Sequence, residues 1–351
     1  MDRQQAHERM DAAIRLTAPG TALREAIDMI LAAHLGALIC IGDTDRVLAS
    51  GNDGFPLDIA FTANRLFELS KMDGAVVIDE DVTVIRRANF HLNPDPSLPT
   101  SETGMRHRTA ARVSMATDAI VIAVSERRQV VGIHVGGHSF QLRAAADLAS
   151  RVSQRVAALQ SSRDSLDVLL TRLTVLEFDD VVTLREITRV FGAFQLLSDA
   201  ADEIRELLPQ LGIDGRLVRA QLEQLTSGMG EQYTLAVRDY ARDPSPEEAA
   251  RVRRDFAVLD PAEMASPPRV ARILGYDGLN DEDVLTARGH RAISRAASLT
   301  CEAAERVSAA YGSLPGLMRA AADDPGRLGE LGVGNPAVFV SSLYRMWGRK
   351  G

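Results

Sequence analysis

The first residues that could do chemistry are Asp73-Gly74-Ala75, which open the apolar run "DGAVVID". Gly74 and Ala75 lack bulk, so a ligand can lie against the backbone there and accept hydrogen bonds from its amides. Asp73, at the edge of this run, is placed to hold a divalent cation or to accept a proton. A carboxylate beside a turn is more often a solvated surface group, so the tripeptide alone is a weak motif.

The stronger signal is the cluster Arg106-His107-Arg108, in "GMRHRTAARV". The two guanidinium groups match phosphate oxygens two at a time, and His107 can bond a phosphate or titrate near neutral pH. The hydroxyls of Thr103 and Thr109 flank the cluster, and the amides at the start of a helix add a positive end. A solvated basic cluster is the alternative reading. Taken with Asp73, the pattern indicates a nucleotide site with a metal carboxylate on one side and a phosphate clamp on the other.

The elements that would position these residues follow a strand–helix–strand order. Short runs rich in Val and Ile, several of them apolar on both alternating faces, predict strands of a sheet that is covered on both sides. Helical spacing lies between them, so the order favours an α/β domain. The predicted strands are 37–42, 75–79, 82–88, 119–125 and 130–135, and the predicted helices are 61–71 and 106–117.

The remainder of the chain has a different pattern. From 142 to 259 apolar residues recur at three- and four-residue intervals, which predicts long amphipathic helices that pack in a core or an interface. From 260 onward short helices follow a Pro-rich connection. The segment 328–346, "LGELGVGNPAVFVSSLYRM", has the pattern of a helix-hairpin-helix, in which glycines let the backbone approach a phosphate.

Composition limits the alternatives. The chain has 351 residues, enough for two or three domains, and a net charge of −8, which argues against a wholly basic nucleic-acid coat protein. Cys40 and Cys301 suit two buried thiols in a reducing compartment. No segment approaches a membrane span or a signal peptide, so we expect a cytoplasmic protein without membrane contact. No P-loop, Gly-x-Gly-x-x-Gly fingerprint or zinc-ligand spacing occurs.

At this point the motifs resemble a known family. Asp73-Gly74-Ala75 together with Arg106-His107-Arg108 look like the paired signature of the diadenylate cyclase domain, and the connecting 89–113 is similar to that family nearly throughout. The helical spine, including "LEFDDVVTLREI", and the terminal hairpin make the whole chain resemble the DisA family of DNA-integrity scanning proteins. The resemblance implies a cyclase domain over 1–141 with a mixed sheet flanked by helices, an all-α spine over 142–259, and a helix-hairpin-helix DNA-binding domain over 260–351.

The resemblance also implies an activity. Two ATP molecules would be joined into cyclic di-AMP with release of two pyrophosphates, at one site assembled from two facing protomers. Mg²⁺ or Mn²⁺ would be the metal cofactor. Family members form octamers with DNA-binding tips, so branched DNA such as a Holliday junction is the implied regulatory partner, with a role in DNA damage and repair.

The residue roles are carried over from the family motifs. Asp73 would bind the metal near the attacking 3′-hydroxyl, and Leu92 would form an apolar wall for the adenine, with His91 at its border. Catalysis would rest on Asp73, Arg106, His107 and Arg108. The ATP-binding residues would be Gly74, Ala75, Leu92, Met105, Arg106, His107, Arg108, Thr109, Ser125 and Arg128.

The sequence departs from the family pattern in places. Met105 stands where threonine is usual. In "ISRAASLT" (293–300) alanine occupies the arginine position of the first hairpin, and Asn335-Pro336-Ala337 replace residues that are often basic. From 284 to 351 nine Arg and Lys stand against five Asp and Glu, a net +4, which favours a DNA-facing tip. The predicted DNA contacts are Gly332, Val333, Gly334, Arg288, Arg291, Arg295 and Arg345.

Two other functions remain open at this stage. The chain could be mainly a DNA-structure-binding checkpoint protein whose nucleotide site is a sensor. It could also be a helical scaffold for oligomerisation, although that reading leaves the Arg-His-Arg cluster unexplained.

Overall fold

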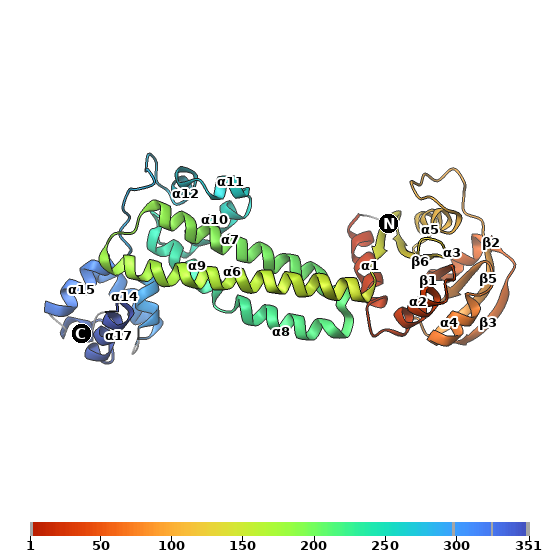
Figure 1. The fold of residues 1–351 in the computed structure, drawn as a ribbon, viewed down its shortest axis with the longest axis horizontal. Coiled ribbons are helices and arrows are strands. Elements are labelled where there is room, and N and C mark those ends of the chain that lie inside the picture. The colour runs from red at the N-terminus through yellow and green to blue at the C-terminus, as the bar shows by residue number, and fades with distance from the viewer. Residues whose placement is uncertain (1–2, 297–298, 324–325, 349–351) are drawn as a thin grey trace. The chain divides into compact units, whose positions relative to one another are not determined.

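The computed structural model describes residues 3–296, 299–323 and 326–348 (Figure 1). These residues form two compact units. The first unit comprises Met1–Gln154 and Ile204–Ala220, and the second comprises Arg155–Glu203 and Gln221–Gly351. Helices α6 (Ala145–Asp179) and α7 (Leu184–Leu207) contribute residues to both.

The first unit is built on a mixed sheet with the order β2-β5-β4-β1-β6-β7-β8, in which β3 pairs with β5. β1 and β4 are parallel, and the other pairs are antiparallel. The five predicted strands are confirmed as β1 (Ala37–Ile41), β4 (Ala75–Ile78), β5 (Val84–Leu92), β6 (Ile120–Ser125) and β7 (Val130–Val135).

Three further strands lie at the ends of the sheet: β2 (Gly51–Asn52), β3 (Phe55–Ala60) and β8 (His138–Leu142). Their sequences did not predict them. β3 contains a proline and the positive-φ residue Asp58, and β8 is largely exposed and polar. Strands at sheet edges tolerate such residues because one side of the ladder is unpaired.

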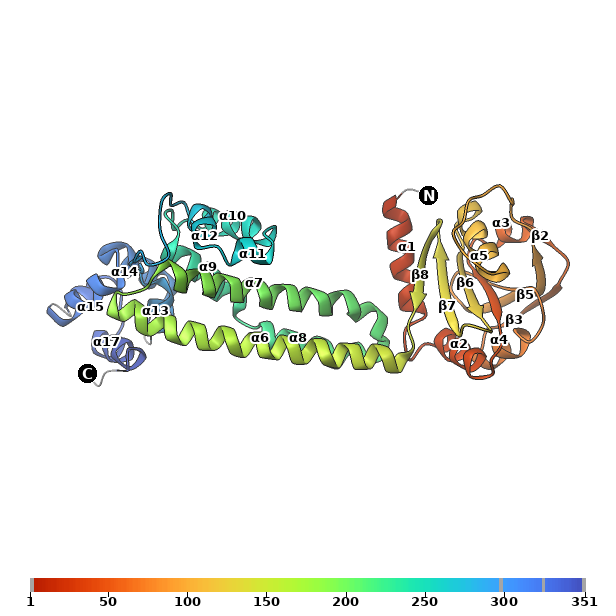
Figure 2. The ribbon, with the colours of Figure 1, turned by 45° about the horizontal axis from the view of Figure 1, so that its top comes forward.

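Helices cover both faces of this sheet (Figure 2). In β1, Ile39 and Ile41 pack in one core with α1 (Arg3–Leu16), α2 (Ala22–Ala32) and α4 (Ala63–Leu69). The alternate residues Leu38 and Cys40 pack in a second core with α3 (Thr44–Ala49) and α5 (Met105–Ala116). Side chains of a strand alternate between faces, so a strand covered on both sides must be apolar throughout. The predicted α/β domain and the two helices beside its strands are therefore confirmed.

The second unit is helical, as the sequence predicted. An aromatic cluster of Phe191, Phe194, Tyr233 and Phe256 packs at its centre. After α7 lie the 3₁₀ segment η1 (Leu208–Asp214), which belongs to the first unit, and α8 (Gly215–Thr226), whose residues are divided between the two units. The later helices are α9 (Met229–Tyr240), α10 (Pro246–Ala257), α11 (Pro261–Met264), α12 (Pro267–Ile273), α13 (His290–Arg295), α14 (Cys301–Tyr311), α15 (Leu314–Asp323), α16 (Gly326–Glu330) and α17 (Pro336–Met346).

The predicted hairpin segment contains α16 and α17, with a short glycine turn between them. Gly332 has φ of 91°, a backbone conformation that favours glycine, and a Cβ there would lie 2.4 Å from Arg306 Nη2 and would displace that guanidinium. Asn335 caps α17 by accepting a hydrogen bond from the Val338 amide at 3.1 Å.

Two expectations about composition also meet the structure here. Cys40 is buried, as expected, whereas the side chain of Cys301 lies outside the described residues. Among the described helices, none combines the length and apolar character that crossing a membrane requires.

Candidate active site

A cavity of about 770 Å³ in the first unit is lined by most of the predicted nucleotide-binding residues. It lies where β4 begins, β5 ends, α5 begins and the β6–β7 turn passes. The predicted residues that line it are Asp73, Gly74, Leu92, Met105, Arg106, His107, Thr109, Ser125 and Arg128. Residues far apart in the sequence therefore meet at one hollow.

The Asp73 side of the cavity is a tight turn into β4. Gly74 has φ of 87°, and a Cβ there would lie 2.8 Å from the Asn89 carbonyl carbon, so only glycine fits. The Asn89 side-chain Nδ2 donates to the Asp73 backbone carbonyl oxygen at 2.7 Å, which fixes the turn against β5. The Asp73 side chain itself is 91% exposed, so its carboxylate is free to meet a ligand.

The opposite side is the start of α5. Gly104, with φ of 98°, stands at the N-cap position, and the helix begins at Met105. Arg106 Nη2 lies 3.9 Å from Asp73 Oδ1, so the two predicted motifs meet across the cavity. The Arg106 guanidinium packs against Gly36, the residue before β1. It can do so because Gly36 has no side chain; a Cβ there would lie 2.6 Å from Arg106 Nη1.

The His107 side chain is more buried than those of Arg106 and Arg108. Its side chain is buried, and this burial lowers the pKa of the imidazole, an effect that Glu102 opposes and Arg128 strengthens. Behind it lies His134 of β7, with ring centroids 6.0 Å apart and planes at 80°. Burial lowers the pKa of His134 to about 4. Both rings are therefore neutral at pH 7, and His134 is buried in the core.

The β6–β7 turn holds the entrance to α5. Arg128 Nη2 donates to the Thr103 carbonyl oxygen at 3.1 Å, and its own amide donates to Ser125 Oγ at 3.3 Å. The segment before α5 is thus tied to the turn by a cation that also lines the cavity. Arg128 and Ser125 therefore shape the phosphate side of the hollow as well as facing it.

Two predicted residues do not line the cavity. Ala75 is fully buried in β4 opposite Phe90, so it can offer close packing but no exposed contact. Arg108 is exposed on α5 and is not among the residues that line the cavity. Within one protomer the described geometry brings Arg106 and His107, but not Arg108, to the hollow.

The cavity also contains residues that sequence reasoning missed. They are Leu38, Phe90, Asn93, Gly104, Val124, Glu126 and Arg127, while Thr103 and His91 were noted only as neighbours. Leu38, Phe90 and Val124 read as plain strand residues, so nothing in their pattern separated them from the core. The charged turn "SERRQ" was a usable signal, because Glu126 and Arg127 follow the already suspected Ser125.

Comparison with known proteins decides the family. Residues 24–139 match the family described as DisA bacterial checkpoint controller nucleotide-binding, and residues 142–282 match the DisA bacterial checkpoint controller linker region. The DNA integrity scanning protein DisA of Symbiobacterium thermophilum is 39% identical over 329 residues, covering 94% of this chain and 93% of its own. That of Thermotoga petrophila is 37% identical over 345 residues, covering 96% and 97%. The chain belongs to the DisA family.

Membership assigns the activity in general terms. This member of the DisA family is a diadenylate cyclase, a nucleotidyltransferase, and the cavity is its nucleotide-binding candidate. Cyclases of the family generally need divalent metal ions. The described residues contain no group of three or more His, Cys, Asp or Glu that could hold a metal alone. A single exposed carboxylate, Asp73, does fit a metal that takes its other ligands from substrate phosphates.

The C-terminal residues predicted to contact DNA divide into two groups. Arg295 and Arg345 are exposed, as are Gly332 and Gly334, whereas the Val333 side chain is buried. Residues 297–298 of the segment "ISRAASLT" lie outside the described residues, so the departure there has no structural account.

Arg288 and Arg291 require a correction. The Arg291 side chain is 1% exposed and pairs with Glu177 at 2.6 Å, so it has no free face for a phosphate. Arg288 donates to four backbone carbonyl oxygens at the end of α9, those of Arg238, Asp239, Ala241 and Arg242. Both arginines hold the second unit together in this structure. Arginine content alone could not separate them from exposed DNA contacts.

Proposed function

We propose that this DisA-family chain condenses two ATP molecules into cyclic di-AMP, releasing two pyrophosphates, at a site that two facing protomers share. The observation that supports this most is the meeting of Asp73 and Arg106 across one cavity, 3.9 Å apart. A carboxylate for the metal and nucleophile, opposite a cation for the phosphates, is the minimum that phosphoryl transfer needs from a protein.

The residues divide the work by their surroundings. Asp73 accepts the proton of the attacking 3′-hydroxyl or orients it toward the α-phosphate of the facing nucleotide. Arg106, Arg128 and the Ser125 hydroxyl hold phosphate oxygens and offset the charge that develops on the leaving pyrophosphate. His107, neutral at pH 7, donates or accepts one hydrogen bond without adding charge. Asp73 would hold the divalent metal, Mg²⁺ or Mn²⁺, which would supply Lewis-acid polarisation of the phosphate.

The apolar part of the cavity suits a base. Its apolar lining residues are Leu38, Phe90, Leu92 and Val124. A purine that lies against such a wall buries its faces, while its edge remains free for hydrogen bonds to backbone groups of the cavity. Gly74 allows the sugar and phosphates to lie close to the start of β4, while Ala75 packs in the core behind it.

The need for two protomers follows from the reaction. Each 3′-hydroxyl attacks the α-phosphate of the other nucleotide, so two ATP molecules must face each other. Asp73 is 91% exposed and Met105 is 78% exposed at the rim, which is open in a single chain and suited to a facing copy. The family resemblance extends this pairing to a homo-octamer in the cytoplasm.

The C-terminal region is proposed to bind branched DNA and to modulate the cyclase. The exposed glycine turn at Gly332 to Gly334, with Arg295 and Arg345, offers backbone amides and cations to phosphates rather than to base edges. The second candidate function, a DNA-structure sensor that merely binds nucleotide, is supported by this same hairpin.

A product assay separates these functions. Full-length protein is mixed with ATP and either Mg²⁺ or Mn²⁺, with and without a four-way junction, and the nucleotides are resolved by chromatography and mass spectrometry. Cyclic di-AMP formed without DNA, at a rate that the junction changes, supports the proposal. Tight junction binding with no dinucleotide under either metal would leave the sensor as the function.

A further inference from the structure

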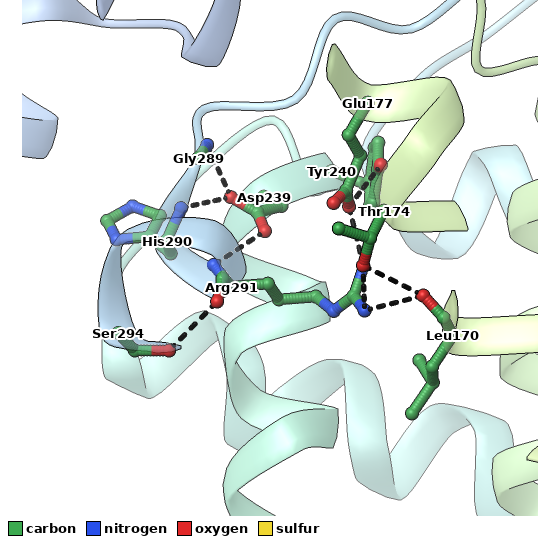
Figure 3. A network of polar contacts seen from close by, with 9 residues as sticks. All are labelled: Leu170, Thr174, Glu177, Asp239, Tyr240, Gly289, His290, Arg291 and Ser294. Carbon is green, nitrogen blue, oxygen red and sulfur yellow. Dashed lines mark hydrogen bonds and ion pairs between the residues drawn. The ribbon is translucent and has the colours of Figure 1, made fainter. Parts of the chain in front are cut away.

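Three consecutive residues in the last turn of α6 contact α9, α13 and Trp347, the residue that follows α17. Glu177 Oε1 accepts hydrogen bonds from Tyr240 Oη of α9 at 2.7 Å and from Arg291 Nη1 of α13 at 2.6 Å (Figure 3). Phe178 stacks on Trp347 at 5.7 Å, with an interplanar angle of 16°. Asp179 Oδ1 accepts from Trp347 Nε1 at 2.8 Å. Successive helical residues project about 100° apart, so the end of α6 is surrounded.

The partner of Glu177 is itself held from both ends. The Arg291 amide, with those of Gly289 and His290, donates to the Asp239 carboxylate at 3.0, 2.8 and 2.6 Å, which ties the start of α13 to α9 (Figure 3). The Arg291 guanidinium also reaches the Leu170 carbonyl oxygen at 3.3 Å. Backbone and side chain of one residue thus connect α13 to α9 and to α6.

The cluster is buried and charged, which makes its response abrupt. Glu177, Asp239 and Arg291 are each about 1% exposed, so the Glu177–Arg291 ion pair lies away from water beside a second carboxylate, Asp239, which is bound by backbone amides. Separating a buried ion pair leaves two charges without partners in a medium of low polarity, which is costly. Such a pair is therefore either formed or broken, with no stable intermediate separation. Glu177 Oε2 and Arg291 Nε have no hydrogen-bond partner among the described residues, so the cluster is not fully satisfied even when closed.

We propose that the last turn of α6, Glu177-Phe178-Asp179, is the coupling joint through which DNA at the hairpin region acts on the cyclase. This rests on the proposed modulation by DNA. α13 holds the joint through Arg291, and α17, which follows the glycine turn, holds it through Trp347. A displacement of either helix must break the buried pair or the stack. The same helix links this turn to the first unit, because residues 145–154 at the start of α6 belong to that unit.

The test uses the full-length protein and two variants. Glu177→Gln keeps the shape of the side chain and removes its charge, and Trp347→Phe keeps the stack and removes the hydrogen bond to Asp179. The matched control is Arg172→Gln, also on α6, which breaks a pair 3.0 Å apart between the exposed Arg172 and the partly buried Glu186 of α7. Each protein is assayed for cyclic di-AMP formation with and without a four-way junction, and for junction affinity by fluorescence anisotropy.

The expected result is specific to coupling. Both variants should keep the DNA-free rate within about twofold and the junction Kd within about threefold of wild type, while the effect of DNA on the rate falls to less than half. The control should respond as wild type does. If the junction changes the rate of both variants as much as that of wild type, the proposed coupling is wrong. It is also wrong if the junction affinity falls in proportion to the loss of the DNA effect.

A second readout does not depend on DNA modulation. In hydrogen exchange without DNA, Glu177→Gln should lower the protection of α13 and α17 amides together, because one joint holds both. Unchanged α17 protection overturns the joint. The wild-type cyclase rate could be unaffected by the junction while Glu177→Gln still lowers the hydrogen-exchange protection of α13 and α17 together. That result would reject modulation of the cyclase by DNA, and with it the transmission through α6. The contacts at the end of α6 would then have a structural role alone.

Discussion

At the scale of the residue, the site depends on groups whose environment sets their state. Asp73 is exposed and ready for a cation, whereas His107 is buried and neutral a short distance away. The contrast arises from position, since Asp73 lies at a turn and His107 faces the sheet from the first turn of α5. The same cavity can therefore present a charged carboxylate and an uncharged imidazole at one pH.

His134 should make the protein sensitive to acid. Burial lowers its pKa to about 4, below the unfolded value near 6.5, so the unfolded chain binds the proton more tightly. The stability it contributes is complete above pH 6.5 and is lost as the pH falls toward 4. When the pH is lowered from 7.5 to 4.5, the unfolding free energy of wild type should therefore fall by about 2–3 kcal/mol more than that of His134→Phe.

Calorimetry of the full chain at both pH values measures this shift. The control is His138→Phe on the neighbouring strand, because His138 is exposed. A His134→Phe variant with the same pH dependence as wild type would show that the buried imidazole is not the sensitive group.

Gly74 should be intolerant of any side chain. Gly74→Ala places a Cβ 2.8 Å from backbone in a positive-φ turn, so strain and overlap add, and we expect a loss of about 2–4 kcal/mol in unfolding free energy. Gly104→Ala is the matched control, because it has φ of 98° and no heavy atom within 4 Å. It should cost only about 1–2 kcal/mol. Equal losses in denaturant unfolding would mean that contact with β5 is not what requires glycine.

At the scale of the element, the start of α13 depends on one carboxylate. Asp239→Ala removes the acceptor of three backbone amides, and unsatisfied buried donors cost about 1–3 kcal/mol each before relaxation. Part of this loss is offset because a buried charge disappears, so we expect a net loss of about 2–3 kcal/mol.

Denaturant unfolding, with hydrogen exchange of α13, measures that loss. The control Asp243→Ala removes an exposed carboxylate that accepts only the Ser245 amide at 2.9 Å, and it should cost under about 1 kcal/mol. Losses of the same size would place the stability of α13 elsewhere.

The elements also show how far sequence could lead. β1, β4 and β6 were predictable because Val and Ile fill both faces of a covered strand. β3 and β8 were not, because edge strands carry the polar residues and the proline of loops. Asp73 and Arg106 were found by residue type. Asp73 precedes β4 and Arg106 is on α5, which precedes β6, and these two strands are separated in the sheet by β1 alone, so the two residues can meet. Arg291 misled, because charge count carries no information about burial.

At the scale of the whole molecule, activity should depend on association. If two protomers share each site, dilution below their dissociation constant should lower the rate per protomer, while ATP binding to each protomer falls much less. Light scattering and rate measured over the same concentration range check this. A constant rate per protomer in a strictly monomeric sample would contradict the shared site.

The most direct measurement concerns Asp73, since the whole account assigns the metal and the nucleophile to it. Wild type, Asp73→Asn and the exposed control Asp81→Asn are incubated with ATP and Mg²⁺ or Mn²⁺, and cyclic di-AMP is quantified by mass spectrometry. We expect wild type and Asp81→Asn to form the product at similar rates and Asp73→Asn to be slower by about 10²–10³-fold or more, with its unfolding transition unchanged. Product formation by Asp73→Asn at the wild-type rate would contradict the account.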